Sequence, residues 1–343
     1  MAIEQTRRQQ ITGLRRVALR ALEQYPVIEA RVQFVAHGEN TTFRIDALDS
    51  SSDRPSTFLL RVHRPNRHGR GVDSAAAIRS ELEWLTAIRA ETHLCVPEPV
   101  ATSTGELVCR AAVDGGESRW CSLLRWMDGR RRTRSARPIH LHRLGAAMAR
   151  LHDHADRWSL PEGFVRITWD RATFFGDVME YGGLPAADVW PLVPARQRQK
   201  FDTVAAEVGA AMDGLGTGPG AFGLIHADLH LDNALFAGSD VRMIDFDDCG
   251  FGFRIYDVAV ALWELRHRDD YHAFRDALLE GYTSQRDLPA EQIALVDAFI
   301  AAREVAFGLW FVGTARVNPA FRARLDDELG FIDSSLDRLL PAL

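Results

Sequence analysis

Three oxygen-bearing side chains stand at spacings that could support metal-assisted chemistry. Asp228 follows the apolar run GLIHA (223–227), and Asn233 follows Asp228 by five residues. A second apolar run, VRMIDF (241–246), carries Asp245, twelve residues after Asn233. A carboxylate can accept a proton from a hydroxyl nucleophile, and amide and carboxylate oxygens are ligands suited to Mg²⁺. Phosphoryl transfer needs these parts, namely an oriented nucleophile and metal-neutralised phosphates.

The elements that must position these residues fall into two halves. The first 127 residues begin with an amphipathic helix over about 11–22 and carry another helix over 74–90. Between and after them lie strand-like runs rich in β-branched and aromatic residues: 30–35, 41–48, 57–63, 106–113 and 119–126. Beyond the polar, Arg-rich segment 127–138, helical periodicity dominates. We therefore expect an α+β fold, with a small sheet and one helix packed on it in residues 1–127 and a larger helical part in 128–343.

Composition narrows the class of protein. The chain of 343 residues has a formal net charge of −6, which does not suit a nucleic acid backbone. Its four cysteines form no C-x-x-C pair, so reduced thiols are expected. No uncharged apolar run approaches the roughly 18 residues of a membrane span. These features predict a soluble cytoplasmic protein that binds neither nucleic acid nor membrane. Lys200 is the only lysine, so chemistry that usually employs lysine must use arginine here.

The central motif resembles a known family. The segment HADLHLDN (226–233) is similar to the H-x-D-x-x-x-x-N catalytic loop of the aminoglycoside phosphotransferase and choline kinase superfamily, distant relatives of protein kinases. The segment IDFD (244–247) resembles that family's counterpart of the kinase D-F-G motif. Further likenesses follow in the family's order: HGENTTFRI (37–45), LLRVHRP (59–65), IRSELEWL (78–85), LLRWMDGR (123–130), LGAAMARLHDHA (144–155) and RIYDVAVALWEL (254–265). The resemblance spans about residues 30–265.

The resemblance implies a bilobal protein-kinase-like fold, with a small antiparallel sheet in the N-lobe and a mainly α-helical C-lobe. By the same resemblance, Asp228 is the catalytic base that orients the acceptor hydroxyl. Asn233 and Asp245 are the catalytic residues that hold Mg²⁺. Asp257 braces the catalytic loop, and His226 has a structural role behind it.

The same resemblance assigns nucleotide-binding residues to the first half of the chain. Arg61 would contact the ATP phosphates, and Glu81, preferred over Glu83, would position it. Gly38 and Asn40 belong to the phosphate-covering hairpin. The remaining two assigned residues would hold adenine through main-chain groups: Arg125 and Met127.

The expected function is ATP-dependent transfer of the γ-phosphate to a hydroxyl of a small molecule, such as an aminoglycoside, an amino alcohol, or a homoserine-like or choline-like acceptor. Because Arg61 stands where lysine is usual and the two are not interchangeable, a non-catalytic nucleotide-binding kinase fold is one alternative. A bacterial stress-response type of Ser/Thr protein kinase is another, although the helical segment 289–343 favours a small acceptor. His226, Asp228 and His230 also allow a metal-hydrolase hypothesis. The sequence leaves open the acceptor, ATP or GTP, a resistance or metabolic role, and the oligomeric state.

Overall fold

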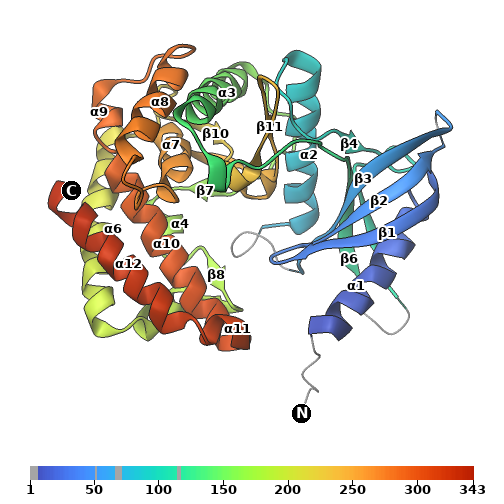
Figure 1. Ribbon diagram of the computed structural model, residues 1–343. Helices are drawn as coiled ribbons and strands as arrows, with labels where there is room; N and C mark the ends of the chain where they lie inside the picture. Colours follow the sequence, from blue (N-terminus) through green and yellow to red (C-terminus); the bar gives the residue numbers. More distant parts are fainter. Residues whose placement is uncertain (1–6, 51, 66–71, 114–116) are drawn as a thin grey trace. The chain divides into compact units, whose positions relative to one another are not determined.

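The computed structural model describes the chain except residues 1–6, 51, 66–71 and 114–116. By its internal contacts the chain divides into two compact units. Unit 1 comprises residues 1–67, 73–128 and 161–165, and unit 2 comprises the remaining residues. The ribbon in Figure 1 labels the elements of both units.

Unit 1 is built on an antiparallel sheet. Its main path runs β1-β2-β3-β6-β4, and β5 pairs with β6 beside that path. The strand bounds are β1 Val27–His37, β2 Thr41–Asp49, β3 Arg54–Val62, β4 Pro99–Val100, β5 Val108–Ala111 and β6 Arg119–Arg125. The predicted antiparallel sheet is confirmed.

Two helices pack on opposite faces of this sheet, because strand side chains alternate between faces. Helix α1 (Arg7–Leu22) buries Val17 and Leu22 in one core cluster with Leu60 and Val62 of β3. The intervening Arg61 instead pairs with a residue of α2 (Ser74–Glu91). Both helices predicted in this part of the chain are present, but the sheet has two helices packed on it and not the one that was expected.

Unit 2 is mainly helical. The helices are α3 Pro138–Arg157, α4 Arg171–Phe175, α5 Ala186–Val189, α6 Ala195–Leu215, α7 Arg254–Trp263, α8 Tyr271–Thr283, α9 Ala290–Ile293, α10 Val296–Val317, α11 Pro319–Arg322 and α12 Leu325–Leu339. Short strands interrupt them: β7 Thr168–Trp169, β8 Glu180–Tyr181, β9 Leu184–Pro185, β10 Phe222–Ile225, β11 Ala234–Ala237, β12 Asp240–Met243 and β13 Gly250–Phe253. The α+β kinase-like architecture is therefore confirmed in both units.

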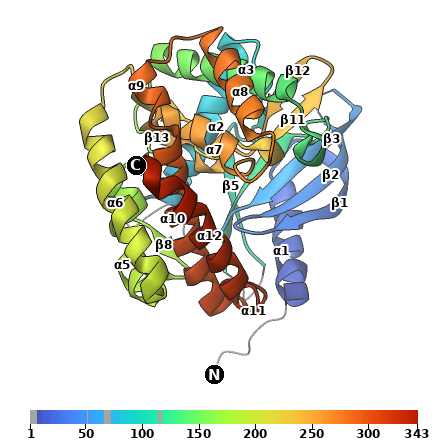
Figure 2. The same ribbon diagram turned by 60° about the vertical axis from the view of Figure 1, so that its left-hand side comes forward.

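Helix α10 forms the centre of unit 2. It contacts α6, α7 and α12, and Figure 2 shows α10 beside α12. By its length and composition alone, α10 could span a membrane. However, 72% of its most apolar window is buried inside the structure, as expected of a core helix.

Helices α3 and α8 approach each other closely because each has a glycine where it contacts the backbone of the other. A side chain at Gly145 of α3 would collide with the backbone of α8, and one at Gly281 of α8 would collide with α3. This close packing brings His152 of α3 and Tyr282 of α8 within a hydrogen bond of each other. Helix α8 supplies one side of this contact.

Candidate active site

The catalytic-loop motif lies between β10 and β11, where the backbone is forced into an unusual conformation. Ala227 is fully buried and has a left-handed φ of 66°, which is unfavourable for a residue with a side chain. The Asp257 carboxylate accepts hydrogen bonds from the backbone N–H groups of His226 at 2.9 Å and Ala227 at 2.6 Å. These bonds hold the loop in its strained conformation, and the predicted bracing role of Asp257 is confirmed.

Asp257 is itself held by a buried chain of hydrogen bonds. His152 Nε2 lies 3.0 Å from Asp257 Oδ2, and His152 Nδ1 lies 2.8 Å from the Tyr282 hydroxyl. The network fits a neutral imidazole that donates to the carboxylate and accepts from the hydroxyl. Burial lowers the pKa of His152, although its hydrogen bond to Asp257 opposes this shift.

Asp228 follows the strained residue, and both of its carboxylate oxygens are bonded. Asn233 Nδ2 donates to Asp228 Oδ2 at 2.9 Å, and Arg303 Nη2 donates to Asp228 Oδ1 at 2.5 Å. Burial favours the neutral acid, but the Arg303 charge and the His230 hydrogen bond outweigh it and lower the pKa of Asp228 to about 2. The carboxylate is therefore ionised at neutral pH, as a proton acceptor must be.

His230 completes the surroundings of Asp228. Its Nε2 lies 3.5 Å from Asp228 Oδ2, and its Nδ1 lies 3.3 Å from Glu264 Oε1. Burial disfavours the imidazolium, but the hydrogen bonds to the two carboxylates outweigh it and raise the pKa of His230 to about 10. His230 therefore places a second positive charge beside the Asp228 carboxylate, and the metal-hydrolase hypothesis stays a prediction.

His226 has a backbone partner at each of its ring nitrogens. Its Nε2 lies 3.0 Å from the Ile244 carbonyl oxygen, and its Nδ1 accepts the backbone N–H of Asp228 at 3.3 Å. Its ring also packs against Phe246. Both ring nitrogens are thus engaged in holding the loop against the segment that carries Asp245, which agrees with the predicted structural role.

The β11–β12 hairpin brings the two predicted metal ligands together. Asn233 directly precedes β11, and its carbonyl oxygen accepts the backbone N–H of Ile244, the residue before Asp245, at 2.9 Å. Asp245 follows β12 with a left-handed φ of 64° and is exposed. Among the described residues, the Asn233 amide nitrogen donates to the Asp228 carbonyl oxygen and to the Asp228 carboxylate, each at 2.9 Å. The amide oxygen is thus available to a cation, so Asn233 and Asp245 fit the oxygen ligands of Mg²⁺.

The segment after Asp245 is fixed by a buried arginine that the sequence reasoning did not identify. Arg166 donates from Nη2 to the Asp247 carbonyl and from Nε to the Cys249 carbonyl, each at 2.5 Å. Trp169 Nε1 donates to the Asp248 carbonyl at 2.8 Å. No local motif surrounds Arg166, so its contacts more than eighty residues along the chain gave no sequence signal.

In unit 1, the predicted pair forms. Arg61 Nη1 lies 2.7 Å from Glu81 Oε1, and the two side chains are only 3% and 0% exposed. Glu83 lies two residues further along α2 and is half-buried. The choice of Glu81 over Glu83 as the partner of Arg61 is therefore confirmed, while the contact of Arg61 with phosphate stays a prediction.

The predicted phosphate-covering hairpin is the β1–β2 turn, which contains Gly38 and Asn40. Asn40 Oδ1 accepts the backbone N–H of Arg64 at 3.1 Å, and Glu39 forms an ion pair with the Arg64 side chain. A Cβ at Gly38 would meet nothing within 4 Å, so no steric conflict requires glycine there. The hairpin is thus held by Arg64 at the end of β3, and its phosphate contacts stay a prediction.

Two further predicted residues lie at the end of β6 in unit 1: Arg125 is its last residue, and Met127 follows two residues later. The Arg125 backbone N–H donates to the Glu98 carbonyl at 2.8 Å, so a contact with adenine would have to use another group of this residue. Its side chain pairs with Asp49 at 2.7 Å. Met127 is half-buried. Their roles in binding adenine remain predictions.

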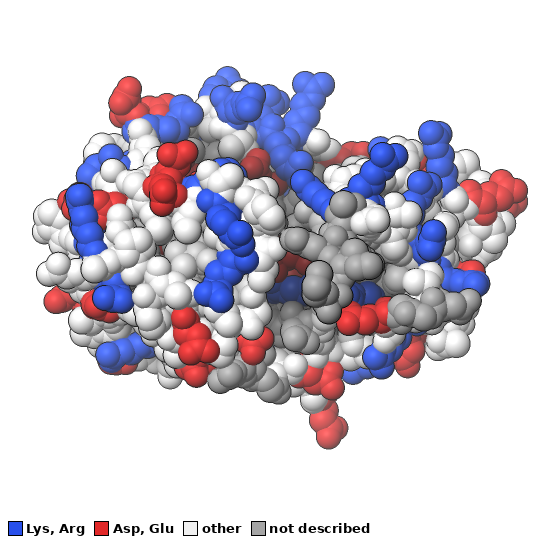
Figure 3. Space-filling model, turned by 90° about the horizontal axis from the view of Figure 1, so that it is seen from below, with Lys and Arg blue, Asp and Glu red and all other residues white. Residues whose placement is uncertain are grey.

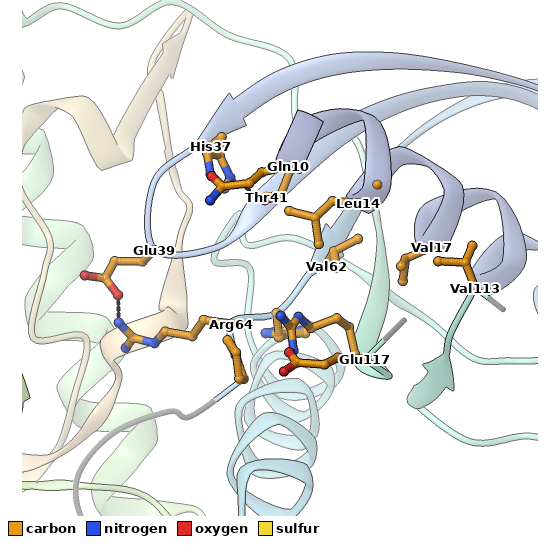
Figure 4. Close-up of a pocket in the computed structure, with 14 residues that line it drawn as sticks. Gln10, Leu14, Val17, His37, Glu39, Thr41, Val62, Arg64, Val113 and Glu117 are labelled. Carbon is orange, nitrogen blue, oxygen red and sulfur yellow. Dashed lines mark hydrogen bonds and ion pairs between the residues drawn. The ribbon is translucent and has the colours of Figure 1, made fainter. Parts of the chain in front are cut away.

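A cavity of about 600 Å³ in unit 1 lies apart from the Arg61–Glu81 pair. It is bounded by α1, the β1–β2 hairpin and the ends of β3 and β6, with Gln10, Leu14, His37 and Val62 among its lining residues (Figure 4). The Glu39–Arg64 ion pair lies at its edge (Figure 4). None of Arg61, Glu81, Gly38 and Asn40 lines it, so this cavity is not the predicted nucleotide site.

Charged side chains of both signs are interspersed over the face shown in Figure 3. Around Asp228 the nearest charged groups are Arg303 and His230.

The fold of the two units and the braced H-x-D-x-x-x-x-N loop define a kinase-like phosphotransferase. A sequence model of the phosphotransferase enzyme family matches residues 31–293. The chain belongs to this family, and it is a phosphotransferase enzyme.

Solved structures show the same fold along nearly the whole chain. A microcompartment-associated aminopropanol kinase superposes with a TM-score of 0.80 at 27% identity, covering 95% of this chain and 98% of that one. An amicoumacin kinase solved with AMP-PNP, Ca²⁺ and its antibiotic has a TM-score of 0.74 at 20% identity, covering 93% of both chains.

Relatives in sequence include a homoserine kinase of Nitrobacter winogradskyi, which is 31% identical over 211 residues. That match covers 60% of this chain and 59% of the homoserine kinase. The amicoumacin kinase of Bacillus subtilis is 23% identical over 301 residues, covering 84% of this chain and 82% of that protein.

Proposed function

We propose that this protein is a small-molecule kinase that transfers the γ-phosphate of ATP directly to a hydroxyl group of its acceptor. The proposal rests on the charge and the hydrogen bonds of the Asp228 carboxylate. Its carboxylate is ionised, held from both sides, and hydrogen-bonded to Asn233, whose amide oxygen is available to a cation. A proton acceptor beside oxygen ligands is the arrangement that phosphoryl transfer to a hydroxyl requires.

The chain's own residues then have distinct tasks. Asp228 hydrogen-bonds the acceptor hydroxyl, orients it toward the phosphorus, and takes its proton late in the transfer. Asn233 and Asp245 hold Mg²⁺, which when bound neutralises charge on the phosphate oxygens. Arg61, oriented by Glu81, contacts phosphate oxygens through its planar guanidinium. Asp257 keeps the strained loop in place so that Asp228 points in one direction.

The relatives indicate the class of acceptor. Their names specify homoserine, aminopropanol and amicoumacin as substrates of those proteins. Homoserine and aminopropanol are small molecules that carry both a hydroxyl and an amino group. A small acceptor with these two groups is therefore the first choice for this protein, and the reduced cysteines are consistent with a cytoplasmic location.

An ADP-release assay with Mg·ATP over a panel of acceptors tests the proposal. The panel should contain homoserine, aminopropanol, ethanolamine, choline, methylthioribose, an aminoglycoside and a generic protein substrate. ADP release that depends on one small acceptor is the expected result. Release with the protein substrate alone would indicate a protein kinase. Binding of Mg·ATP without turnover on any acceptor would indicate a non-catalytic nucleotide-binding protein.

A further inference from the structure

One cation touches the candidate base directly and belongs to no motif identified in the sequence. Arg303 lies in α10, the core helix of unit 2, and its Nη2 donates to Asp228 Oδ1 at 2.5 Å across 75 residues of sequence. The side chains of Arg303 and Asp228 are 17% and 19% exposed. An ion pair with so little solvent contact is weakly screened, so its effect on the carboxylate is strong.

The Arg303 side chain is itself held in place by α7. Its Nη1 donates to the Tyr256 hydroxyl at 3.2 Å, and its guanidinium carbon lies 5.3 Å from the centre of the Trp263 ring. An arginine over an indole face gains a cation–π attraction that grows as water is excluded. The guanidinium is therefore fixed by two aromatic residues independently of Asp228, and it presents Nη2 to the carboxylate in one orientation.

The two bonds to Asp228 together fix the plane of its carboxylate. Asn233 holds Oδ2 at 2.9 Å, while Arg303 holds Oδ1. Each carboxylate oxygen has two lone pairs. Arg303 is the side chain that bonds Oδ1 among the described residues, so one lone pair of Oδ1 is left for an incoming hydroxyl.

We infer that Arg303 is a positioning residue for phosphoryl transfer. It fixes Asp228 so that the second lone pair of Oδ1 faces the acceptor hydroxyl. This inference rests on the proposed function, because it requires Asp228 to be the group that meets the acceptor. Without Arg303 the carboxylate can rotate about its last side-chain bond, and a misplacement of about 1 Å can cost on the order of a hundredfold in rate.

If Arg303 had a purely structural role, its loss would lower stability and kcat no more than the loss of another buried arginine. Arg266 provides that matched control. Arg266 forms a buried ion pair with Glu304, the neighbour of Arg303 on α10, and its guanidinium also packs on Trp263. Arg266→Met therefore removes a buried arginine that packs against α10 and Trp263 but, among the described residues, does not bond Asp228.

The test compares Arg303→Met, Arg303→Gln and Arg303→Lys with Arg266→Met, using thermal unfolding, Mg·ATP affinity and kcat with the best acceptor. Arg303→Met should lower kcat on the order of a hundredfold, while Mg·ATP affinity changes less than threefold. Lysine and glutamine retain a donor and should recover part of kcat. Arg266→Met should lose stability to a similar extent but keep kcat within threefold.

Chemical rescue provides a measurement that does not depend on the stability of the variants. Added guanidinium, at concentrations below those that unfold the protein, should raise kcat of Arg303→Ala but not that of Arg266→Ala. If Arg303→Met folds poorly, Arg303→Lys and the rescue of Arg303→Ala decide the question. Wild-type kcat in all folded Arg303 variants, or equal kcat losses in the Arg303 and Arg266 variants with no rescue, would overturn the inference.

Asp228→Asn distinguishes failure of this inference from failure of the proposed function. An inactive Asp228→Asn together with fully active Arg303 variants would reject the role of Arg303 alone. An active Asp228→Asn would reject the proposed role of Asp228 and with it the basis of the inference. If both residues act in one unit, Arg303→Met should cost little further kcat in the Asp228→Asn background.

Discussion

At the scale of single residues, the Arg61–Glu81 pair combines burial with charge. Both side chains are almost completely removed from water, so each ion depends on the other for compensation. The family resemblance leads one to expect lysine at this position, and the planar guanidinium of Arg61 contacts Glu81 through Nη1. The pair is therefore expected to matter for stability as well as for phosphate binding.

Arg61→Met should lower the free energy of unfolding by about 3–5 kcal/mol, because it leaves the Glu81 carboxylate buried without its partner. The double variant Arg61→Met/Glu81→Met should recover much of this loss. Urea unfolding measures both values, and Glu83→Met on the same helix is the control. Equal stability of the single and double variants would show that the ion pair is not the cause. Both Arg61 variants should raise the KM for ATP.

At the scale of elements, the bracing of the catalytic loop depends on contacts between helices α3, α7 and α8. Asp257 of α7 holds the backbone before Asp228, His152 of α3 holds Asp257, and Tyr282 of α8 holds His152. The strained backbone conformation of Ala227 persists because the hydrogen bonds of this network hold it in place.

The same network gives a pH dependence of stability. Burial lowers the pKa of His152 in the folded protein below the ordinary value of about 6.5, so the unfolded chain binds more protons in that range. The free energy of unfolding therefore falls as the pH drops below about 6.5. His152→Gln lacks this contribution. In urea unfolding, the stability difference between the wild type and His152→Gln should shrink as the pH falls from 7.5 to 5.5. A difference that stays constant or grows would contradict a neutral buried His152.

Local spacing pointed to the loop and to the candidate metal ligands Asn233 and Asp245, because HADLHLDN and the strand before Asp245 are each short continuous segments. Their roles as metal ligands stay predictions. The partners that tertiary packing supplies could not be predicted in this way. Arg303 reaches Asp228 from 75 residues away, and its one sequence signal is a charge inside the apolar segment of α10. Strands such as β7 and β8 have two residues each, too short to show an alternating pattern.

At the scale of the whole molecule, ligand binding should be visible as stabilisation. A ligand that binds only the folded state raises its stability by about 2.7 kcal/mol at a concentration of 100 Kd. Mg·ATP should therefore raise the melting temperature, and removal of divalent cations should abolish most of the shift. Asp245→Asn should lose the shift as well, while Asp240→Asn, an exposed carboxylate on the same hairpin, should keep it. An unchanged shift in Asp245→Asn would count against Asp245 as a metal ligand.

Each compact unit carries its own set of predicted site residues. Unit 1 contains the buried Arg61–Glu81 pair, and unit 2 contains Asp228 with Asn233 beside it. The group proposed to meet the acceptor, Asp228, belongs to unit 2.

The most direct measurement is the single-turnover rate of phosphoryl transfer from Mg·ATP to the best acceptor, in the wild type and in Asp228→Asn, with Mg·ATP affinity measured beside it. Asparagine keeps the shape of the side chain but cannot take the proton. The account predicts nearly unchanged Mg·ATP affinity and a loss of transfer on the order of 10²–10⁴-fold. Transfer at the wild-type rate in Asp228→Asn would contradict it.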